Sequence, residues 1–152
     1  MNDTKQVIFK VGNEEFGLDI MLVNAIEKYT NIVKVPNTLE CIEGIINLRG
    51  DVIPVYSLRK KFGLPKTDAS EETKLIVAKS LGMLMAYEVD SVQEIIEIKG
   101  ENISEPPMIV KSKHTSYMKC VANINGRMII LLDHDGIISS AEKEKIENLV
   151  EE

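Results

Sequence analysis

The segment that most constrains the fold of this chain is residues 44–63, which read GIINLRGDVIPVYSLRKKFG. Two short apolar stretches, 45–48 and 52–55, flank a turn at Arg49-Gly50-Asp51, and this order predicts a β-hairpin. The segment contains no catalytic motif. It predicts a compact β unit that displays one prominent charge, Arg49, at its turn.

The hairpin is followed by the signals of a short helix over residues 57–62. Ser57 can cap its first turn, Lys60 and Lys61 suit its negative end, and Gly63 suits a left-handed stop. Pro54 cannot donate a hydrogen bond to a neighbouring strand. We therefore expect the strand with Pro54 to lie at the edge of its sheet or to end at that residue.

The chain repeats this plan in its second half. A second hairpin is expected around Asn125-Gly126, between residues 120–123 and 128–133. A repeat of roughly 70 residues predicts two similar small β-barrels. The residues that align in register are Asn47, Gly50, Ile53 and Phe62 with Asn123, Gly126, Ile129 and Ile138, and Gly17, Ile20, Val23 and Ile26 with Ala86, Val89, Val92 and Ile95.

The remaining elements are predicted to be mostly short strands separated by polar loops, with further strands at residues 6–11, 16–20, 75–79, 83–89 and 94–98. A short helical turn is expected within 21–26, an edge segment within 32–36 and a linker at 66–73. Residues 139–152 predict the one clear α-helix, in which Ser139 and Glu142 form a capping box and Ile146, Leu149 and Val150 form an apolar stripe.

The composition argues against several classes of function. The net charge is −6, tryptophan is absent and 5% of residues are aromatic, whereas nucleic-acid binding needs a basic face and stacking platforms. No apolar run approaches the roughly 18 residues of a membrane span, so the chain is expected to be soluble. Cys41 and Cys120 form no paired-spacing motif and are expected to be buried, reduced thiols.

Candidate catalytic and metal-binding residues are few. Asp133-His134-Asp135 is the most tempting metal-binding sequence, but at a strand end the two aspartates would face one side and His134 the other. A polar transition from strand to turn is the preferred interpretation, and no metal or other cofactor is expected. His114 lies in a polar loop and is expected to be solvated. The chain contains no serine elbow, phosphate loop or dinucleotide fingerprint, so we do not expect an enzyme.

Arg49 is the residue that these patterns leave unexplained. Glycine, asparagine or aspartate is preferred in a hairpin turn. An arginine there is either a solvated charge or a contact residue, and composition leaves both open. Arginine is enriched at binding hot spots because it combines a planar fork of donors with an apolar stem.

The motifs described above resemble those of the CheW-type chemotaxis coupling proteins over nearly the whole chain. The central match covers residues 44–50, 52–55, 58–59 and 62–63, and supporting matches lie at Phe9, 17–20, Val23, Ile26, 35–36, 89–92 and 129–133. The resemblance implies a mainly β fold of two intertwined, five-stranded β-barrels with short helical turns and a C-terminal α-helix. It implies a single domain over 1–152, with lobes at about 12–65 and 74–138 that exchange strands, and a terminal helix at 139–152.

The resemblance also implies a function. Such proteins are non-enzymatic scaffolds that couple the cytoplasmic tips of chemoreceptors (methyl-accepting chemotaxis proteins) to the regulatory domain of a CheA-type histidine kinase, in two-component signal transduction. The groove between the lobes is expected to receive the receptor tip. The protein is expected in the cytoplasm, recruited to membrane-associated receptor arrays, without nucleic acid and without direct insertion into the membrane. The residues expected to bind the receptor are Arg49, Asn47, Leu48, Gly50, Val33 and Val35.

The sequence departs from the family pattern at several positions. The family often has an acidic residue at the position of Ala25 and an aspartate at that of Ser57, and a glycine is usual at or next to Met85 and at Cys120. A change at Ala25 would alter a partner contact. Two alternatives therefore stay open: a divergent adaptor for a kinase pathway other than motility, and a β-barrel module that binds a ligand or assembles with itself.

Overall fold

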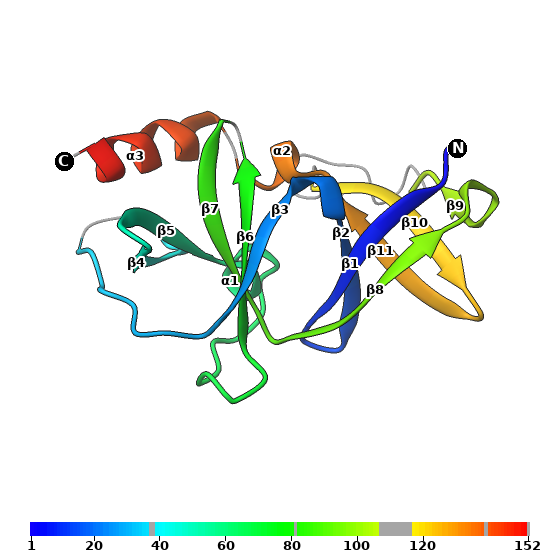
Figure 1. Cartoon of the computed structure of the whole chain (residues 1–152), viewed down its shortest axis with the longest axis horizontal. Coiled ribbons are helices and arrows are strands. Elements are labelled where there is room, and N and C mark those ends of the chain that lie inside the picture. Colours follow the sequence, from blue (N-terminus) through cyan, green and yellow to red (C-terminus); the bar gives the residue numbers. More distant parts are fainter. Residues whose placement is uncertain (37–38, 81, 107–116, 139, 152) are drawn as a thin grey trace.

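The computed structural model describes residues 1–36, 39–80, 82–106, 117–138 and 140–151, which form two β-sheets that share a core (Figure 1). Sheet A has the order β8 (Ser91–Ile98), β1 (Thr4–Val11), β2 (Glu14–Asp19), β11 (Arg127–Leu132), β10 (Met118–Ile124) and β9 (Ile103–Ser104). Sheet B has the order β3 (Val23–Lys28), β6 (Lys74–Ser80), β7 (Met83–Val89), β5 (Asp51–Ser57) and β4 (Ile42–Leu48). The predicted mainly β fold is confirmed, and the two-residue β9 gives sheet A a sixth strand.

The two sheets are built on one plan. In sheet A the parallel pair β2–β11 joins the hairpins β1–β2 and β10–β11, and in sheet B the parallel pair β7–β5 joins the hairpins β6–β7 and β4–β5. An antiparallel strand extends each sheet, β8 beside β1 and β3 beside β6. The hairpins β4–β5 and β10–β11 also share a register shift, between Ile42 and Gly44 and between Met118 and Cys120. Cys120 thus occupies the position that Gly44 has in sheet B.

The chain crosses between the sheets rather than completing one before the other. Sheet A combines the N-terminal strands β1 and β2 with β8–β11, and sheet B holds the intervening strands β3–β7 (Figure 1). The first crossing is the predicted helical turn, a 3-10 helix η1 (Ile20–Leu22), and a later one is the single residue Asp90 between β7 and β8. The lobe limits at about 12–65 and 74–138 stay a prediction.

The largest apolar cluster lies where the two sheets meet. It joins Val7 and Phe9 of sheet A to Tyr56, Ile76 and Tyr87 of sheet B, all of them buried. Each sheet also has a smaller cluster of its own, around Ile53 and Val55 in sheet B and around Ile8 and Ile129 in sheet A. Because burial of apolar area is the main favourable term in folding, the shared cluster holds the two sheets together.

The predicted helical segments are present. Helix α1 (Leu58–Lys61) follows the hairpin, Ser57 Oγ accepts the Lys60 amide hydrogen at 3.3 Å, and Gly63 has a φ of +76°. Helix α3 (Ser140–Glu151) docks on sheet B through the fully buried Ile146. Short helical turns also form at α2 (His134–Ile137) and η2 (Gly100–Asn102). Ser139, His114 and the side chains of Leu149 and Val150 lie outside the described residues.

The prediction for Pro54 was wrong. Strand β5 lies between β7 and β4, and it continues to Ser57. Pro54 pairs with Ile45 of β4, whereas the parallel ladder to β7 begins only at Val55. An interior strand tolerates the proline because β7 has not yet begun to pair with β5 at that residue.

Candidate docking surface

The turn between β4 and β5 holds Arg49 in a left-handed backbone conformation. Arg49 has a φ of 52° and Gly50 a φ of 91°, the pattern of a type I′ hairpin. The side chain of Asn47 supports the turn, because its Oδ1 accepts the Gly50 amide hydrogen at 3.0 Å. Asn47 and Gly50, both predicted as contact residues, therefore have a clear structural task in shaping the turn that presents Arg49.

The matching turn of sheet A shows what this conformation prefers. Asn125 has a φ of 50°, Gly126 has a φ of 86°, and Asn123 Oδ1 accepts the Gly126 amide hydrogen at 3.3 Å. Asparagine tolerates the left-handed region well, whereas most other side chains are strained there. Within the described residues, Arg49 and Asn125 are the only non-glycine residues with positive φ. Arg49 thus stands where local preference favours asparagine, and such strain is concentrated at functional sites.

The guanidinium of Arg49 is exposed and is held by a single nitrogen atom, Nη2. Its side chain is 74% exposed, and its Nη2 donates a hydrogen bond to Glu27 Oε1 at 3.2 Å. Glu27 lies on β3 and Arg49 follows β4, which are the two opposite edge strands of sheet B. The ion pair therefore joins the two ends of the sheet, as expected in a small barrel. Glu27 is the only polar partner of Arg49 in the described part of the chain.

The partner residue Glu27 was missed by the sequence reasoning, which singled out Ala25. Alternate residues of a strand share a face, so Ala25 and Glu27 lie on the same face of β3. Ala25 is half-buried and packs against the apolar cluster of sheet B. Glu27 is the only acidic residue of 23–28 and lies two positions after Ala25, and this spacing was the signal that could have identified it.

Sheet A also carries an arginine next to its turn, but that arginine is fully engaged. Arg127 donates from Nε and Nη2 to the two oxygens of Glu15 at 3.1 and 2.6 Å, and its Nη1 lies 3.5 Å from Glu94. The hydrogen bonds from Arg127 hold the pKa of Glu15 below its usual value. The two halves therefore differ in the availability of their arginines, since Arg127 is bidentate within its own sheet and Arg49 is not.

The structure places Val33 beside the Arg49 hairpin. Val33 is 64% exposed, and its backbone exchanges two hydrogen bonds of 2.9 Å with Ile45 of β4. Gly44 permits this approach, because its φ is +153° and a Cβ there would collide with the Val33 carbonyl oxygen. Val35 is half-buried, and Leu48 is half-buried against the apolar cluster of sheet B. Val33 is thus the most exposed apolar member of the predicted contact set.

A groove begins directly after Arg49. It has a volume of about 490 Å³ and is lined by Gly50, Asp51, Val52, Ile53, Pro54, Met83, Leu84 and Glu147. Val52, on β5, is exposed, and Glu147 belongs to helix α3. The groove therefore combines apolar side chains with acidic residues at its margin, next to an exposed arginine.

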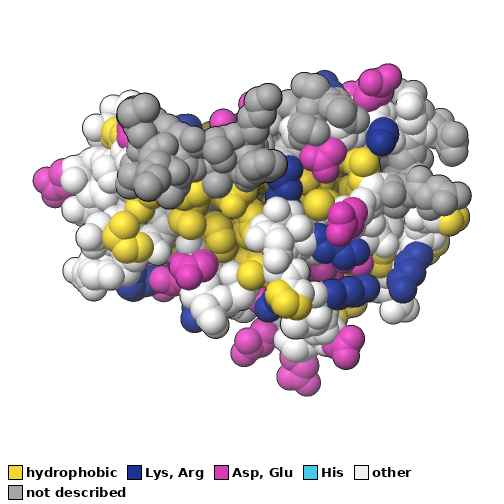
Figure 2. All heavy atoms as spheres, turned by 180° about the vertical axis from the view of Figure 1, so that it is seen from behind, with side chains coloured by type: hydrophobic (Ala, Val, Ile, Leu, Met, Phe, Trp, Pro, Cys, Tyr) yellow, Lys and Arg dark blue, Asp and Glu magenta, His cyan; other side chains and the backbone are white. Residues whose placement is uncertain are grey.

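Hydrophobic side chains also gather in the middle of the face that is seen when the molecule is viewed from behind (Figure 2). Partly buried residues packed against the shared core include Leu39, Leu64, Phe62 and Tyr117. The ring of Phe62 stacks on that of Phe16 at a centroid separation of 4.7 Å, and it contacts the tilted ring of Tyr117 at 4.8 Å. Such clustered apolar surface is typical of a protein that binds other proteins.

The prediction that His134 faces away from Asp133 and Asp135 was wrong. The segment is the first turn of α2, and the ligand atoms of Asp133, His134 and Asp135 lie within 4.8 Å of one another. Asp133 is the N-cap, because its Oδ1 accepts the Asp135 amide hydrogen at 3.1 Å, and His134 Nε2 lies 3.2 Å from Asp135 Oδ1. The carboxylate of Asp133 is thereby engaged by the backbone of its own turn, and capping accounts for its position.

The cysteines are free and half-buried. Burial raises the pKa of the Cys41 thiol, whereas a reactive cysteine needs a lowered pKa. No helix among the described residues is long and apolar enough to cross a membrane. The displayed arginine and the apolar side chains gathered on one face are features typical of a β-rich scaffold that binds other proteins.

Comparison with known proteins identifies the family. The family model described as CheW-like domain matches residues 5–142. A chemotaxis protein CheW of Klebsiella aerogenes is 32% identical over 143 residues, which cover 94% of this chain and 86% of that protein, and one of Bacillus subtilis is 26% identical over 92% of this chain and 90% of that protein. The crystal structure of the scaffolding protein TtCheW from Thermoanaerobacter tengcongensis has a TM-score of 0.84 and 38% identity, and the match covers 93% of this chain and 96% of that chain.

The chain therefore belongs to the CheW family. The predicted CheW-like fold is confirmed by the structural match. CheW proteins are non-catalytic scaffold proteins of chemotaxis, and membership in this family confirms the prediction that the chain is not an enzyme.

Proposed function

We propose that this protein couples the cytoplasmic tips of chemoreceptors to a CheA-type histidine kinase. The observation that carries the proposal is Arg49, an exposed arginine that is held in a left-handed conformation where asparagine is preferred. Selection for stability alone favours asparagine at this position, as in the matching turn of sheet A. A contact between Arg49 and a partner would explain why this position has an arginine.

The surroundings of Arg49 suit a helical partner with acidic and apolar side chains. Val33 and Val52 supply exposed apolar area near the turn, and the groove behind the turn continues this surface. Arg49 keeps Nε and Nη1 available beside its single bond to Glu27, so it can bind a carboxylate of the partner. Apolar grooves commonly bind amphipathic helices, and a charge at the rim fixes orientation. We assign Arg49, Val33, Val35 and Leu48 to the receptor side, with Asn47 and Gly50 as the residues that shape the turn.

The kinase is proposed to bind elsewhere on the same scaffold, so that one chain can bridge two partners in the cytoplasm at the receptor array. The duplicated plan supports this, because each sheet presents its own hairpin. Weak contacts gain strength when many copies act together. An adaptor for a kinase pathway other than motility is the alternative, and it has the same fold and the same bridging chemistry.

The test is receptor control of kinase activity in a mixture of receptor, kinase and adaptor. Arg49→Glu reverses the charge of the turn and should abolish receptor control, while the circular dichroism spectrum and affinity for the kinase are retained. Lys5→Glu is the matched control, because Lys5 is an exposed cation on β1 of the other sheet, outside the hairpins β4–β5 and β10–β11. Normal receptor control with Arg49→Glu would show that Arg49 is not the contact. A wild-type chain that binds neither a receptor nor a CheA-type kinase would instead favour a ligand-binding or self-assembling module.

A further inference from the structure

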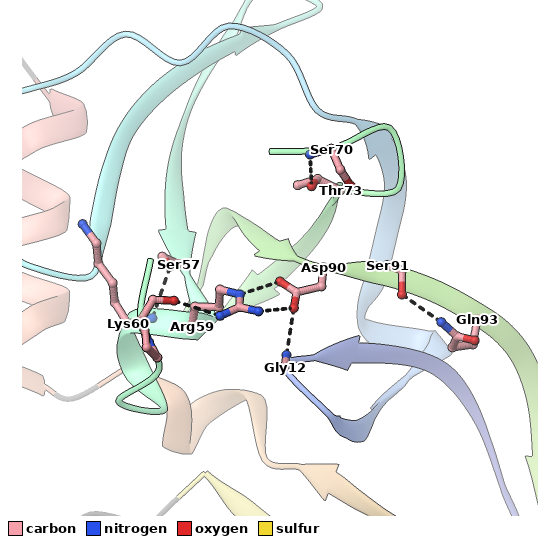
Figure 3. A network of polar contacts seen from close by, with 10 residues as sticks. Gly12, Ser57, Arg59, Lys60, Ser70, Thr73, Asp90, Ser91 and Gln93 are labelled. Carbon is pink, nitrogen blue, oxygen red and sulfur yellow. Dashed lines mark hydrogen bonds and ion pairs between the residues drawn. The ribbon is translucent and has the colours of Figure 1, made fainter. Parts of the chain in front are cut away.

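Asp90 is the point at which the chain passes from sheet B to sheet A. It is the single residue between β7 of sheet B and β8 of sheet A. Three segments converge on its carboxylate: the end of β7, the turn after β1 and helix α1 (Figure 3). The residue therefore lies at a joint between the two sheets.

Every hydrogen bond at this joint is short and directional. Arg59 of α1 donates from Nε to Asp90 Oδ1 at 2.9 Å and from Nη2 to Asp90 Oδ2 at 2.8 Å. The Gly12 amide, in the β1–β2 turn, donates to the same Oδ2 at 2.8 Å. Arg59 Nη1 donates to the Pro65 carbonyl oxygen at 2.8 Å, and the Asp90 amide donates to the Lys10 carbonyl oxygen at 3.0 Å.

The geometry points to a positioning role for Arg59 and Asp90: we propose that they form a clamp that fixes the orientation of sheet A relative to sheet B. The shared apolar core holds the sheets together, but apolar attraction is non-directional and permits packed layers to slide. A bidentate arginine–carboxylate pair restricts both distance and angle. The pair is also more shielded than a surface ion pair, since the side chains of Arg59 and Asp90 are 20% and 30% exposed.

Close backbone packing at the joint also supports a fixed orientation of sheet A relative to sheet B. Gly12 has a φ of +65°, and a Cβ at this position would lie 2.9 Å from Leu64 Cδ1. The β1–β2 turn of sheet A is therefore seated against the segment that follows α1, immediately beside the Pro65 carbonyl that Arg59 binds. The clamp thus ties one end of sheet A to the helix that follows the Arg49 hairpin of sheet B.

The effect of the clamp on signalling rests on the proposed function. A scaffold that binds one partner on each side must present the two surfaces at a defined angle, and the clamp sets that angle. Loss of the clamp should weaken the coupling between receptor and kinase more than it weakens the binding of either partner alone.

The chain provides a matched control. Arg127 and Glu15 form a bidentate pair of the same kind, but both residues belong to sheet A, on the neighbouring strands β11 and β2. Arg127→Gln removes a comparable pair without touching the joint. An effect of general destabilisation should appear in both variants, whereas an effect on the orientation of the sheets should appear only when the clamp is removed.

Residual dipolar couplings of the backbone amides measure the orientation directly and need no partner. In the wild type and in Arg127→Gln, the couplings of both sheets should fit one alignment tensor with the orientation seen in the structure. In Arg59→Gln and Asp90→Asn, the two sheets should fit a changed relative orientation or tensors of different magnitude. Asp90→Asn retains an acceptor for Gly12, and Arg59→Lys retains the charge, so these milder variants decide the question if Arg59→Gln does not fold.

Wild-type orientation and one common tensor in the clamp variants would overturn the inference. Partner assays form a separate arm, in which receptor binding, kinase binding and receptor control of the kinase are measured for the same variants. If the proposed function is wrong, the wild type binds no partner while the dipolar couplings still respond to Arg59→Gln. If the clamp is wrong, the couplings do not change, whatever the partner assays show.

Discussion

The strained turn at Arg49 leads to a prediction that separates stability from function. Arg49→Asn should relieve the strain of the left-handed conformation that Arg49 adopts at φ 52°, because asparagine is favoured there, and it should stabilise the chain where the ion pair with Glu27 is absent. The reciprocal change Asn125→Arg should destabilise it, because Asn125 adopts nearly the same conformation at φ 50°. Both hairpins have the same supporting hydrogen bond from a glycine amide to an asparagine side chain, so the comparison isolates the side chain at the turn.

The magnitude follows from two opposing terms. Relief of the left-handed strain is worth about 0.5–1 kcal/mol. Loss of the exposed ion pair with Glu27 costs about 0.2–1 kcal/mol, because the Arg49 side chain is largely in water. The two terms nearly cancel in the wild-type background. In a Glu27→Gln background the ion pair is already absent, and Arg49→Asn should then raise the free energy of unfolding by the strain term alone.

Urea denaturation of four chains tests this: Glu27→Gln with and without Arg49→Asn, and the wild type with and without Asn125→Arg. A gain of 1 kcal/mol corresponds to roughly 2–4 °C in the melting temperature for a protein of this size. The reasoning is refuted if Arg49→Asn destabilises the Glu27→Gln chain, or if Asn125→Arg leaves stability unchanged. Receptor control should be lost in the Arg49→Asn chain even where that chain is the more stable one.

Two further predictions concern sheet B. Burial is the main cause that raises the pKa of Glu88, and the negative charge of Glu43 raises it further. The ionised carboxylate of Glu88 is therefore disfavoured in the folded state, and it lowers the free energy of unfolding at pH values above the folded pKa. Glu88→Gln should therefore raise the melting temperature at neutral pH, and the gain should vanish below the unfolded value of 4.5; an equal gain at both pH values would contradict this. Gly44→Ala should cost about 1–3 kcal/mol in backbone strain and more through collision with the Val33 carbonyl. Gly50→Ala is its control, because Gly50 also has positive φ but no atom lies within 4 Å of a Cβ there, and equal losses in urea denaturation would disprove the collision.

Much of this fold could be predicted from local sequence because its turns and helix caps need particular residue types. Arg49-Gly50-Asp51 predicted one hairpin turn, Asn125-Gly126 predicted the other, and Ser57 predicted the cap of α1. The prediction for Pro54 failed because the pairing of β5 with β7 depends on which strands become neighbours, and no local pattern encodes this. The polar transition after β11 was expected at Asp133, but helix α2 was not predicted, because four residues are too few to show a helical apolar period.

The candidate site was harder to predict than the fold because its contacts join residues far apart in the sequence. Arg49 stood out by its residue type at a turn, but its partner Glu27 became visible only when the two edge strands of sheet B met. The Arg59–Asp90 pair has the same origin, since it joins α1 to a strand crossing 31 residues away. The sequence contains these charges, but only the topology shows which of them meet.

The duplicated plan of the two sheets explains how this protein can tolerate the strained residue Arg49 at its proposed binding surface. In sheet A the turn has the relaxed residue Asn125, and the nearby Arg127 is bound to two carboxylates of its own sheet. In sheet B the turn has the strained residue Arg49, and its guanidinium has one bond. The strain at Arg49 is about 1 kcal/mol, small beside the 5–15 kcal/mol of a typical domain. Because the two sheets share one apolar core, the buried contacts of both sheets offset the strain at the single turn of sheet B.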